Sequence, residues 1–253
     1  MNTFAYVGCY TTPERDGRGK GINVYRVDRR SGAFKHVQLL GGLENPSFLA
    51  IDRTGRFLYS VHGDRSDVTA YAIDAGTGHL RVIGRQPTGG YNPIHLAFDA
   101  SGKFLFVANY GTDSIAVFPV KPDGTLGPYP TLTTVKGTLG PHRTEQKNVR
   151  PHHNPLDRQG KFFYLPTKGA DSVITYRLDT RRCLAVHANE VAAGGGGGEG
   201  GGGGQSRREV GDAVNKIDST PVAASPCTPT MYPRGPAPAR ATSTSIRDAR
   251  SPT

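Results

Sequence analysis

Three short segments of this chain share one pattern, Asp-x-x-Gly followed by a basic residue and Phe. They begin at Asp52, Asp99 and Asp157, so the pattern recurs after 47 and 58 residues. Asp hydrogen-bonds its own downstream backbone and Gly accepts a positive φ, so each segment predicts a tight turn between two strands. A repeat of about 45 residues built from short antiparallel strands is typical of the blades of a β-propeller.

The strands around these turns set the number of blades. Residues 46–90 and 92–138 each contain four predicted strands, and residues 151–192 form a third unit whose end is less regular. The N-terminal segment adds three strands, at 4–7, 21–25 and 34–37, and lacks an opening strand. No segment has helical periodicity. The chain is therefore predicted to be all-β, a partial β-propeller of about four four-stranded antiparallel blades over residues 1–193.

The last quarter of the chain has a different composition. Residues 194–204 are ten glycines around Glu199, and no Leu or Phe occurs from Gly194 to Thr253. Such a segment buries too little apolar surface to offset the entropy of the chain. We therefore expect residues 194–253 to be a disordered tail, and the place where later blades would stand. Reading-frame slippage in GC-rich coding sequence would also produce such text, and resequencing of the source DNA tests that hypothesis.

Charge and composition limit the partners. The formal net charge is +10, but no basic stripe with interleaved aromatic residues occurs, so nucleic-acid binding is not predicted. A solvated basic surface explains the charge most simply, and a small anionic substrate would explain part of it. No apolar run is long enough to span a membrane, and the first residues lack a signal-peptide pattern.

Cysteine usage and the glycine run bear on cofactors and compartment. The three cysteines lack metal-ligand spacing, and their odd number argues against a disulfide framework. The glycine run lacks the Lys-Ser/Thr of a phosphate loop. We therefore predict no metal and no cofactor, and a cytoplasmic location.

Several short motifs carry a resemblance to a known family. Two motifs lie between the second and third repeats, and three lie in the earlier blades: 140–146, 150–154, 45–47, 61–65 and 107–110. In combination they resemble the lactonase family of seven-bladed β-propellers, which includes 6-phosphogluconolactonases and carboxymuconate cyclases. The resemblance runs continuously over about residues 3–193 and is patchy beyond Gly194.

The resemblance implies roles for individual residues. His152 matches the family's site histidine, which would transfer a proton during ring opening; His153 is the competing register. His142 and Arg143 lie in the matching loop and would contact the substrate. These residue types suit the chemistry, because histidine exchanges protons near neutral pH and arginine grips carboxylate or phosphate. A polar loop without catalytic function is the alternative.

Two departures from the family lie in the tail. Arg207 is the best match for a family arginine, but the Pro and His of that motif are absent, and a solvated linker arginine is the stronger alternative. Lys216 stands where the family has glutamate, which reverses the charge and removes an acceptor. By resemblance the chain would hydrolyse an anionic sugar lactone such as 6-phosphogluconolactone, with impaired or no activity.

Two other functions remain open from the sequence. The chain could be a non-enzymatic propeller fragment that binds a partner, because a fold does not fix a function. It could also be a truncated product without a function of its own. Open blade edges would then favour self-association.

Overall fold

The computed structural model describes residues 2–128, 131–179 and 184–193. These residues form fourteen β strands and one short 3-10 helix, η1 (Pro13–Arg15), and contain no α-helix. In this part of the chain no helix has the length and apolar character needed to cross a membrane. The expectation of an all-β chain is confirmed.

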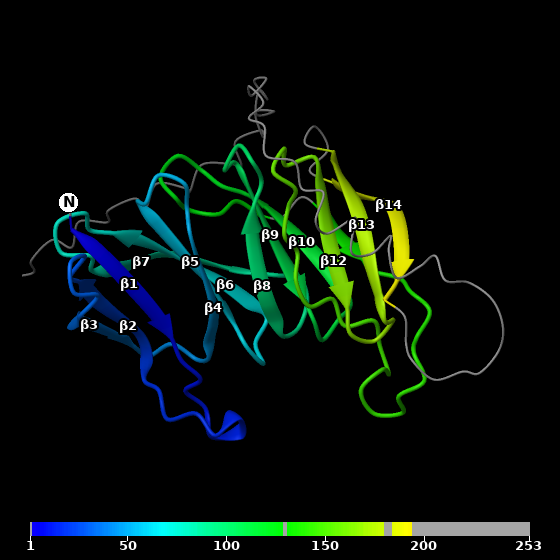
Figure 1. Cartoon of the computed structure of the whole chain (residues 1–253), viewed down its shortest axis with the longest axis horizontal. Helices are drawn as coiled ribbons and strands as arrows, with labels where there is room; N and C mark the ends of the chain where they lie inside the picture. The colour runs from blue at the N-terminus through cyan, green and yellow to red at the C-terminus, as the bar shows by residue number, and fades with distance from the viewer. Residues whose placement is uncertain (1, 129–130, 180–183, 194–253) are drawn as a thin grey trace, which may run out of the picture.

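The strands form four antiparallel sheets that follow one another in chain order (Figure 1). The first sheet contains β1 (Thr3–Gly8), β2 (Gly21–Val27) and β3 (Phe34–Gly41). The second contains β4 (Pro46–Ile51), β5 (Phe57–His62), β6 (Asp67–Ile73) and β7 (Leu80–Pro87). The third contains β8 (Pro93–Phe98), β9 (Phe104–Asn109), β10 (Ser114–Pro119) and β11 (Thr131–Thr134). The fourth contains β12 (Phe162–Thr167), β13 (Ser172–Asp179) and β14 (Leu184–Ala192).

The repeated turns fold as their sequence predicts. In the second sheet, the carboxylate of Asp52 accepts hydrogen bonds from the backbone N–H groups of Arg56 and Phe57, at 2.9 and 2.8 Å. Gly55 has a φ of 70°, which a residue with a side chain adopts at a cost. Gly102 and Gly160 repeat this conformation in the next two sheets, so one turn type starts all three hairpins.

The core lies between the sheets, and strands in the middle of the array are buried on both faces. In β5, Leu58 packs toward the first sheet with Ile22, whereas its neighbour Tyr59 packs toward the third sheet. In β9, Leu105 faces the second sheet and Phe106 faces the fourth. Each fully buried side chain of this size contributes about 1.5–3 kcal/mol. We call the three interfaces the first, second and third junctions, in chain order.

The first and last sheets have three strands each, whereas the two middle sheets have four. The first sheet starts at β1, which matches the predicted lack of an opening strand. In the fourth sheet, residues 151–156 run beside β12 but pair with it only through isolated bridges at Pro151 and Leu156. Pro155 lacks an N–H group and so removes one donor from this pairing, whereas Pro151 matches the prolines that open β4 and β8.

Candidate functional site

The innermost strand of each sheet after the first is entered through an X-Pro pair in an unusual backbone conformation. The residues before proline are Asn45, Asn92 and Arg150, with φ values of 41°, 52° and 55°. The carbonyl oxygen of each accepts a hydrogen bond of 2.9–3.1 Å from the next turn of its own sheet. These residues and the turns 63–66, 110–113 and 168–171 lie at one end of the sheets, which we call the rim.

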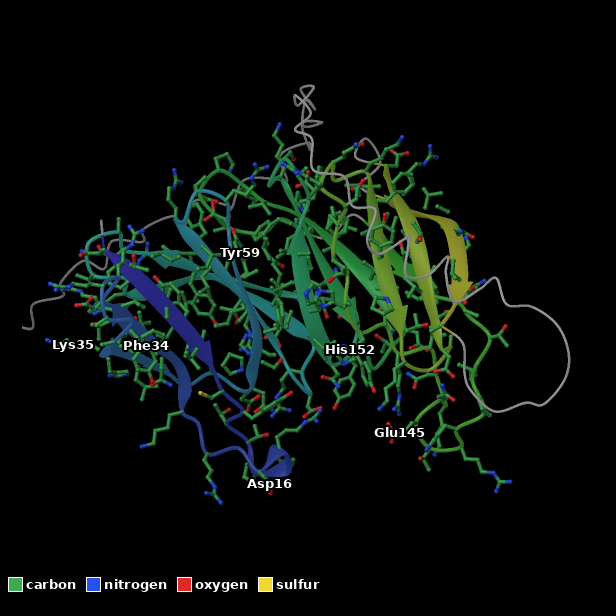
Figure 2. All side chains as sticks on the ribbon, viewed as in Figure 1. Asp16, Phe34, Lys35, Tyr59, Glu145 and His152 are labelled. Carbon is green, nitrogen blue, oxygen red and sulfur yellow. The ribbon has the colours of Figure 1, made fainter. Side chains whose placement is uncertain are left out.

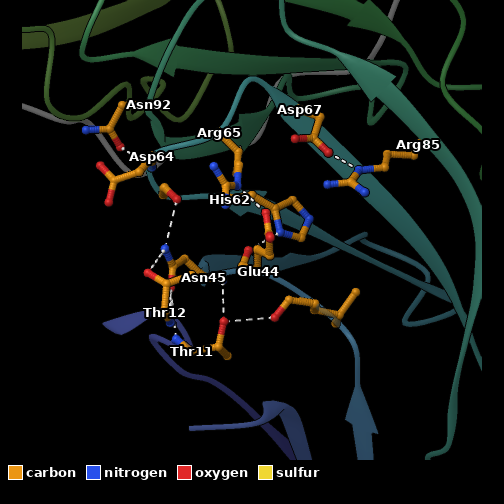
Figure 3. A network of polar contacts seen from close by, with 12 residues as sticks. Thr11, Thr12, Glu44, Asn45, His62, Asp64, Arg65, Asp67, Arg85 and Asn92 are labelled. Carbon is orange, nitrogen blue, oxygen red and sulfur yellow. Dashed lines mark hydrogen bonds and ion pairs between the residues drawn. The ribbon is translucent and has the colours of Figure 1, made fainter. Parts of the chain in front are cut away.

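At the first two junctions, the side chain of the asparagine links neighbouring sheets (Figure 3). Asn45 Oδ1 accepts hydrogen bonds from the backbone N–H groups of Thr11 and Thr12, at 2.8 and 3.2 Å. Asn92 Oδ1 accepts one from the backbone N–H of Asp64, at 3.1 Å. Both asparagines are buried, so their amides serve the packing of the sheets rather than the solvent.

At the third junction the direction of this link is reversed. The carboxylate of Asp113, in the turn of the third sheet, accepts hydrogen bonds from the backbone N–H groups of Val149 and Arg150, at 3.0 and 2.7 Å. It also accepts one from the side-chain amide of Asn148, at 3.2 Å. The acceptors of this link are therefore supplied by the earlier sheet and not by the side chain at position 150.

The Arg150 guanidinium is instead held at the rim. Its Nη1 donates hydrogen bonds to Glu145 Oε2 at 3.0 Å and to the Tyr110 hydroxyl at 3.3 Å, and its Nε donates to Asn148 Oδ1 at 3.0 Å. The guanidinium carbon lies over the Tyr110 ring, 5.3 Å from its centre, and 19% of the side chain is exposed. Four contacts, three hydrogen bonds and one with an aromatic ring, fix the position of a cation that still reaches solvent.

Glu145 forms ion pairs with two cations, Arg150 and Lys168. Lys168 Nζ hydrogen-bonds the same carboxylate oxygen, Oε2, that Arg150 contacts. Both cations lower the pKa of Glu145, and the hydrogen bond from Lys168 is the largest cause. Two positive charges share one negative charge, so this group of three side chains carries an excess positive charge.

His152 lies two residues beyond Arg150, and its ring is exposed. Its backbone N–H donates to the carbonyl of Pro166 at 3.0 Å, which fixes the main chain. The edge of its ring meets the Tyr110 ring, with ring centres 5.9 Å apart and an angle of 86° between the planes. Neither ring nitrogen hydrogen-bonds a described residue, so both are open to a ligand. Figure 2 shows His152 and Glu145 toward the same end of the sheets as Asp16.

His153 lies in different surroundings from His152. Its ring packs on the ring of His95, with centres 3.6 Å apart, and Phe48 packs near His95 with centres 4.3 Å apart. These three residues occupy equivalent positions on the inner segments of three sheets. Burial lowers the pKa of His153, and burial lowers the pKa of His95 to about 4. Both rings are therefore neutral at pH 7, and they pack between sheets.

Another buried histidine is structural. His62, at the end of β5, hydrogen-bonds the carbonyl of Glu44 at 2.7 Å (Figure 3). It also hydrogen-bonds the hydroxyl of Thr69 at 2.8 Å. Burial lowers its pKa, so it too stays neutral. His62, His95 and His153 are thus at least partly buried. His152 differs from them because it is exposed and its ring nitrogens make no hydrogen bond to a described residue.

The other predicted site residues are His142, Arg143 and Arg207, and the structure records no contact of His142 or Arg143 with His152. His142 is exposed, and its Nδ1 accepts a hydrogen bond of 3.2 Å from the backbone N–H of Glu145, which fixes the turn that carries Glu145. Arg143 is exposed and has no hydrogen bond or ion pair with a described residue. Arg207 lies outside the described residues. The structure thus brings His152 close to Arg150 and records no contact between His142 and His152.

Sequence reasoning placed Arg150, Tyr110 and Glu145 in the motifs that carry the family resemblance but gave none of them a role in the site. One signal was available for Arg150, because asparagine precedes proline in the two earlier repeats and arginine does so in the third. A cavity of about 520 Å³ lies elsewhere, between the outer strands β11 and β14, lined among others by Lys136, His187 and Glu190. Within the described ranges, no group of three His, Cys, Asp or Glu side chains is arranged to hold a metal ion.

Comparison with known proteins shows similarity to two 6-phosphogluconolactonases. The chain is 30% identical over 175 residues to the 6-phosphogluconolactonase of Bacillus subtilis, which covers 68% of this chain and 48% of that protein. It is 29% identical over 181 residues to the 6-phosphogluconolactonase of Formosa agariphila, covering 69% and 49%. The chain therefore spans about half the length of the curated relatives it matches.

A solved structure and a family model agree with these relatives. The periplasmic gluconolactonase of Pseudomonas aeruginosa superimposes with a TM-score of 0.60 at 29% identity, covering 70% of this chain and 50% of that one. The model of the family described as "Lactonase, 7-bladed beta-propeller" matches residues 4–199. This match confirms the resemblance carried by the sequence motifs. With its four sheets and its rim, the chain belongs to the seven-bladed β-propeller lactonase family.

Proposed function

We propose that the rim is a sugar-lactone site, at which His152 transfers protons and the cations around it hold an anionic substrate. The observation that carries this proposal is that the exposed His152 ring and the fixed Arg150 guanidinium contact the same ring, that of Tyr110. The names of the relatives support the reaction, since they are 6-phosphogluconolactonases and a gluconolactonase.

The reaction assigns a simple task to each group. Water attacks the lactone carbonyl, the ring C–O bond breaks, and the products are a carboxylic acid and an alcohol in one molecule. An exposed neutral imidazole accepts a proton from the attacking water and returns it to the departing ring oxygen. A fixed cation nearby favours the negative charge that develops on the carbonyl oxygen or that the substrate already carries.

We further propose that this chain hydrolyses its substrate weakly or not at all. Lys216 stands where the family pattern has a glutamate, and Arg207 lacks the Pro and His that accompany the family arginine. Purified protein is expected to hydrolyse 6-phosphogluconolactone no faster than its His152→Ala variant. A clearly higher rate in the unmodified chain would overturn the prediction of impairment and would support proton transfer by His152.

Binding tests the site independently of turnover. 6-Phosphogluconate, the product of the reaction, is expected to raise the melting temperature, because a ligand of the native state stabilises it by mass action. A partner-binding fragment without a sugar-acid site would show no shift. Absence of a shift at millimolar ligand would therefore count against the proposed function and in favour of the scaffold alternative.

We also propose that the open edge of the array favours self-association. Strand β1 pairs with β2 on one side and has no described strand on the other. An unpaired strand edge offers backbone donors and acceptors to another chain. Light scattering tests this, and a monodisperse monomer would contradict it.

A further inference from the structure

We infer that Arg150 is the specificity-determining residue of the rim, which recognises the anionic group of the sugar ligand, and that Asp113 is its positioning residue. The inference rests on the proposed function, because it names the part of the ligand that this site reads. It starts from the reversed link at the third junction, in which Asp113 accepts the hydrogen bonds. The two earlier repeats do not predict this reversal.

Because of the reversal, the side chain at position 150 does not have to supply the acceptors of the link. At the second junction, Asn92 must supply the acceptor for the neighbouring sheet, so no longer side chain fits that role. At the third junction, Asp113 supplies the acceptors, and the same backbone turn forms with a φ of 55° at Arg150. An arginine at that backbone conformation gains nothing in stability over asparagine, which tolerates it better. The exchange is explained if the guanidinium itself has a use.

The Arg150 guanidinium is placed so that its Nη2 atom remains available to an anionic ligand. Nε and Nη1 are hydrogen-bonded to Asn148, Glu145 and Tyr110. Among the described residues, none accepts a hydrogen bond from Nη2. The Arg150 side chain is only 19% exposed, so its orientation is fixed and little rotational entropy is lost when an anion binds. Two Nη2 N–H groups and the excess charge shared with Lys168 suit a phosphate or carboxylate oxygen.

Tyr110 sets the distance between this cation and the proton-transfer residue. The Arg150 guanidinium lies over its ring and the His152 ring meets the same ring at its edge. A ligand held by Arg150 would thus have its other end near His152. The site would select sugar acids by the anionic group they carry away from the reacting carbon, and we expect a phosphate to bind better than a hydroxyl at that position.

The test compares two ligands on the unmodified chain and on two variants. The dissociation constants of 6-phosphogluconate and gluconate, which differ by the phosphate, are measured by calorimetry for the unmodified chain, Arg150→Gln and Lys147→Gln. Lys147→Gln removes an exposed charge from the same loop and serves as the matched control. We expect 6-phosphogluconate to bind about tenfold tighter than gluconate to the unmodified chain and to Lys147→Gln, and the preference to disappear in Arg150→Gln.

The outcomes separate this inference from the proposed function. An unchanged preference in Arg150→Gln overturns the inference and leaves the lactone site standing. If neither sugar acid binds the unmodified chain, the proposed function fails, and inorganic phosphate then serves as the probe. Phosphate that stabilises the unmodified chain but not Arg150→Gln still supports the role of Arg150, and phosphate without effect on either overturns it.

A double-mutant cycle tests the role of Asp113. Asp113→Asn keeps one oxygen acceptor and removes the other, and we expect it to weaken 6-phosphogluconate several-fold while gluconate changes little. In the Arg150→Gln background the same substitution is expected to have no further effect on 6-phosphogluconate. Equal losses for both ligands, or additive losses in the double variant, would show a general structural role and overturn the positioning role. Asp171→Asn is the control, since that aspartate occupies the equivalent turn of the fourth sheet.

Discussion

The second and third junctions contain the same backbone turn, but the acceptor that links the two sheets comes from opposite sides of the junction. At the second junction the later sheet supplies the acceptor, from the buried amide of Asn92. At the third junction the earlier sheet supplies it, from the carboxylate of Asp113. The comparison shows that a repeat can preserve its geometry while transferring a structural task from one residue to another, and that the position relieved of this task can carry a different side chain.

The largest expected effect comes from removing the acceptor at the third junction. Asp113→Ala leaves the N–H groups of Val149 and Arg150 without their partner, and hydrogen bonds to a charged group contribute about 1.5–3 kcal/mol each. We expect the free energy of unfolding to fall by about 3 kcal/mol in a denaturant titration.

Asp171→Ala provides the control for this loss. Both aspartates have a positive φ, 50° at Asp113 and 45° at Asp171, so the backbone penalty of alanine is common to the two variants. The Asp171 carboxylate makes no hydrogen bond to a described residue. A loss of equal size in both variants would contradict the importance of the reversed link.

A second difference between the junctions is the ring pair on the inner segments, and it predicts a dependence of stability on pH. Burial lowers the pKa of His95 to about 4 in the folded chain, against about 6.5 when unfolded. Between these values the unfolded chain binds more protons, so stability is present above pH 6.5 and falls as the pH drops toward 4. We expect a loss of about 2 kcal/mol between pH 7 and pH 5.

His95→Phe tests the source of this dependence. Phenylalanine occupies the equivalent position of the second sheet, at Phe48, so the ring fits the inner strand and does not titrate. The loss between pH 7 and pH 5 should shrink in this variant, with the remainder arising from His62 and His153, whose pKa values are also lowered by burial. The exposed His79→Gln is the control. An unchanged pH dependence in His95→Phe would rule out His95 as its cause.

The smallest expected effect is that of Arg150→Asn, which restores the residue found in the other two repeats. Asparagine tolerates the positive φ, and this gain offsets the lost contacts with Tyr110 and Glu145, so stability should change by less than about 1 kcal/mol. The reverse substitution, Asn92→Arg, removes a buried acceptor and should cost more. Equal costs at the two positions in denaturant unfolding would show that the junctions do not differ as described.

Most of the fold could be predicted from the sequence, because its signals are local. The turns at Asp52, Asp99 and Asp157 and the alternating strands beside them require only neighbouring residues. The three-stranded first sheet also followed from the missing opening strand. The weak pairing of residues 151–156 was not predicted, although Pro155, which lacks an N–H group, accounts for one missing hydrogen bond.

The candidate site was predicted in part, through the motif that contains His152. The contacts that hold Arg150 were not predicted, since Asp113 and Arg150 are distant in sequence and meet only when two sheets pack. His142 and His153 stay predictions as substrate contacts, with His153 packed on His95. The predicted tail, including Arg207, lies outside the described residues, and its origin stays a hypothesis for DNA sequencing.

The two-sided burial of β5 has a consequence for how the array comes apart. Leu58 and Tyr59 are adjacent in sequence, yet each contributes to a different junction. The free energy of the array is then close to a sum of sheets and nearest-neighbour junctions, as in other repeat architectures. Unfolding would therefore start at a terminal sheet and advance one junction at a time, and amide hydrogen exchange would resolve it as a series of steps with a separate free energy for each.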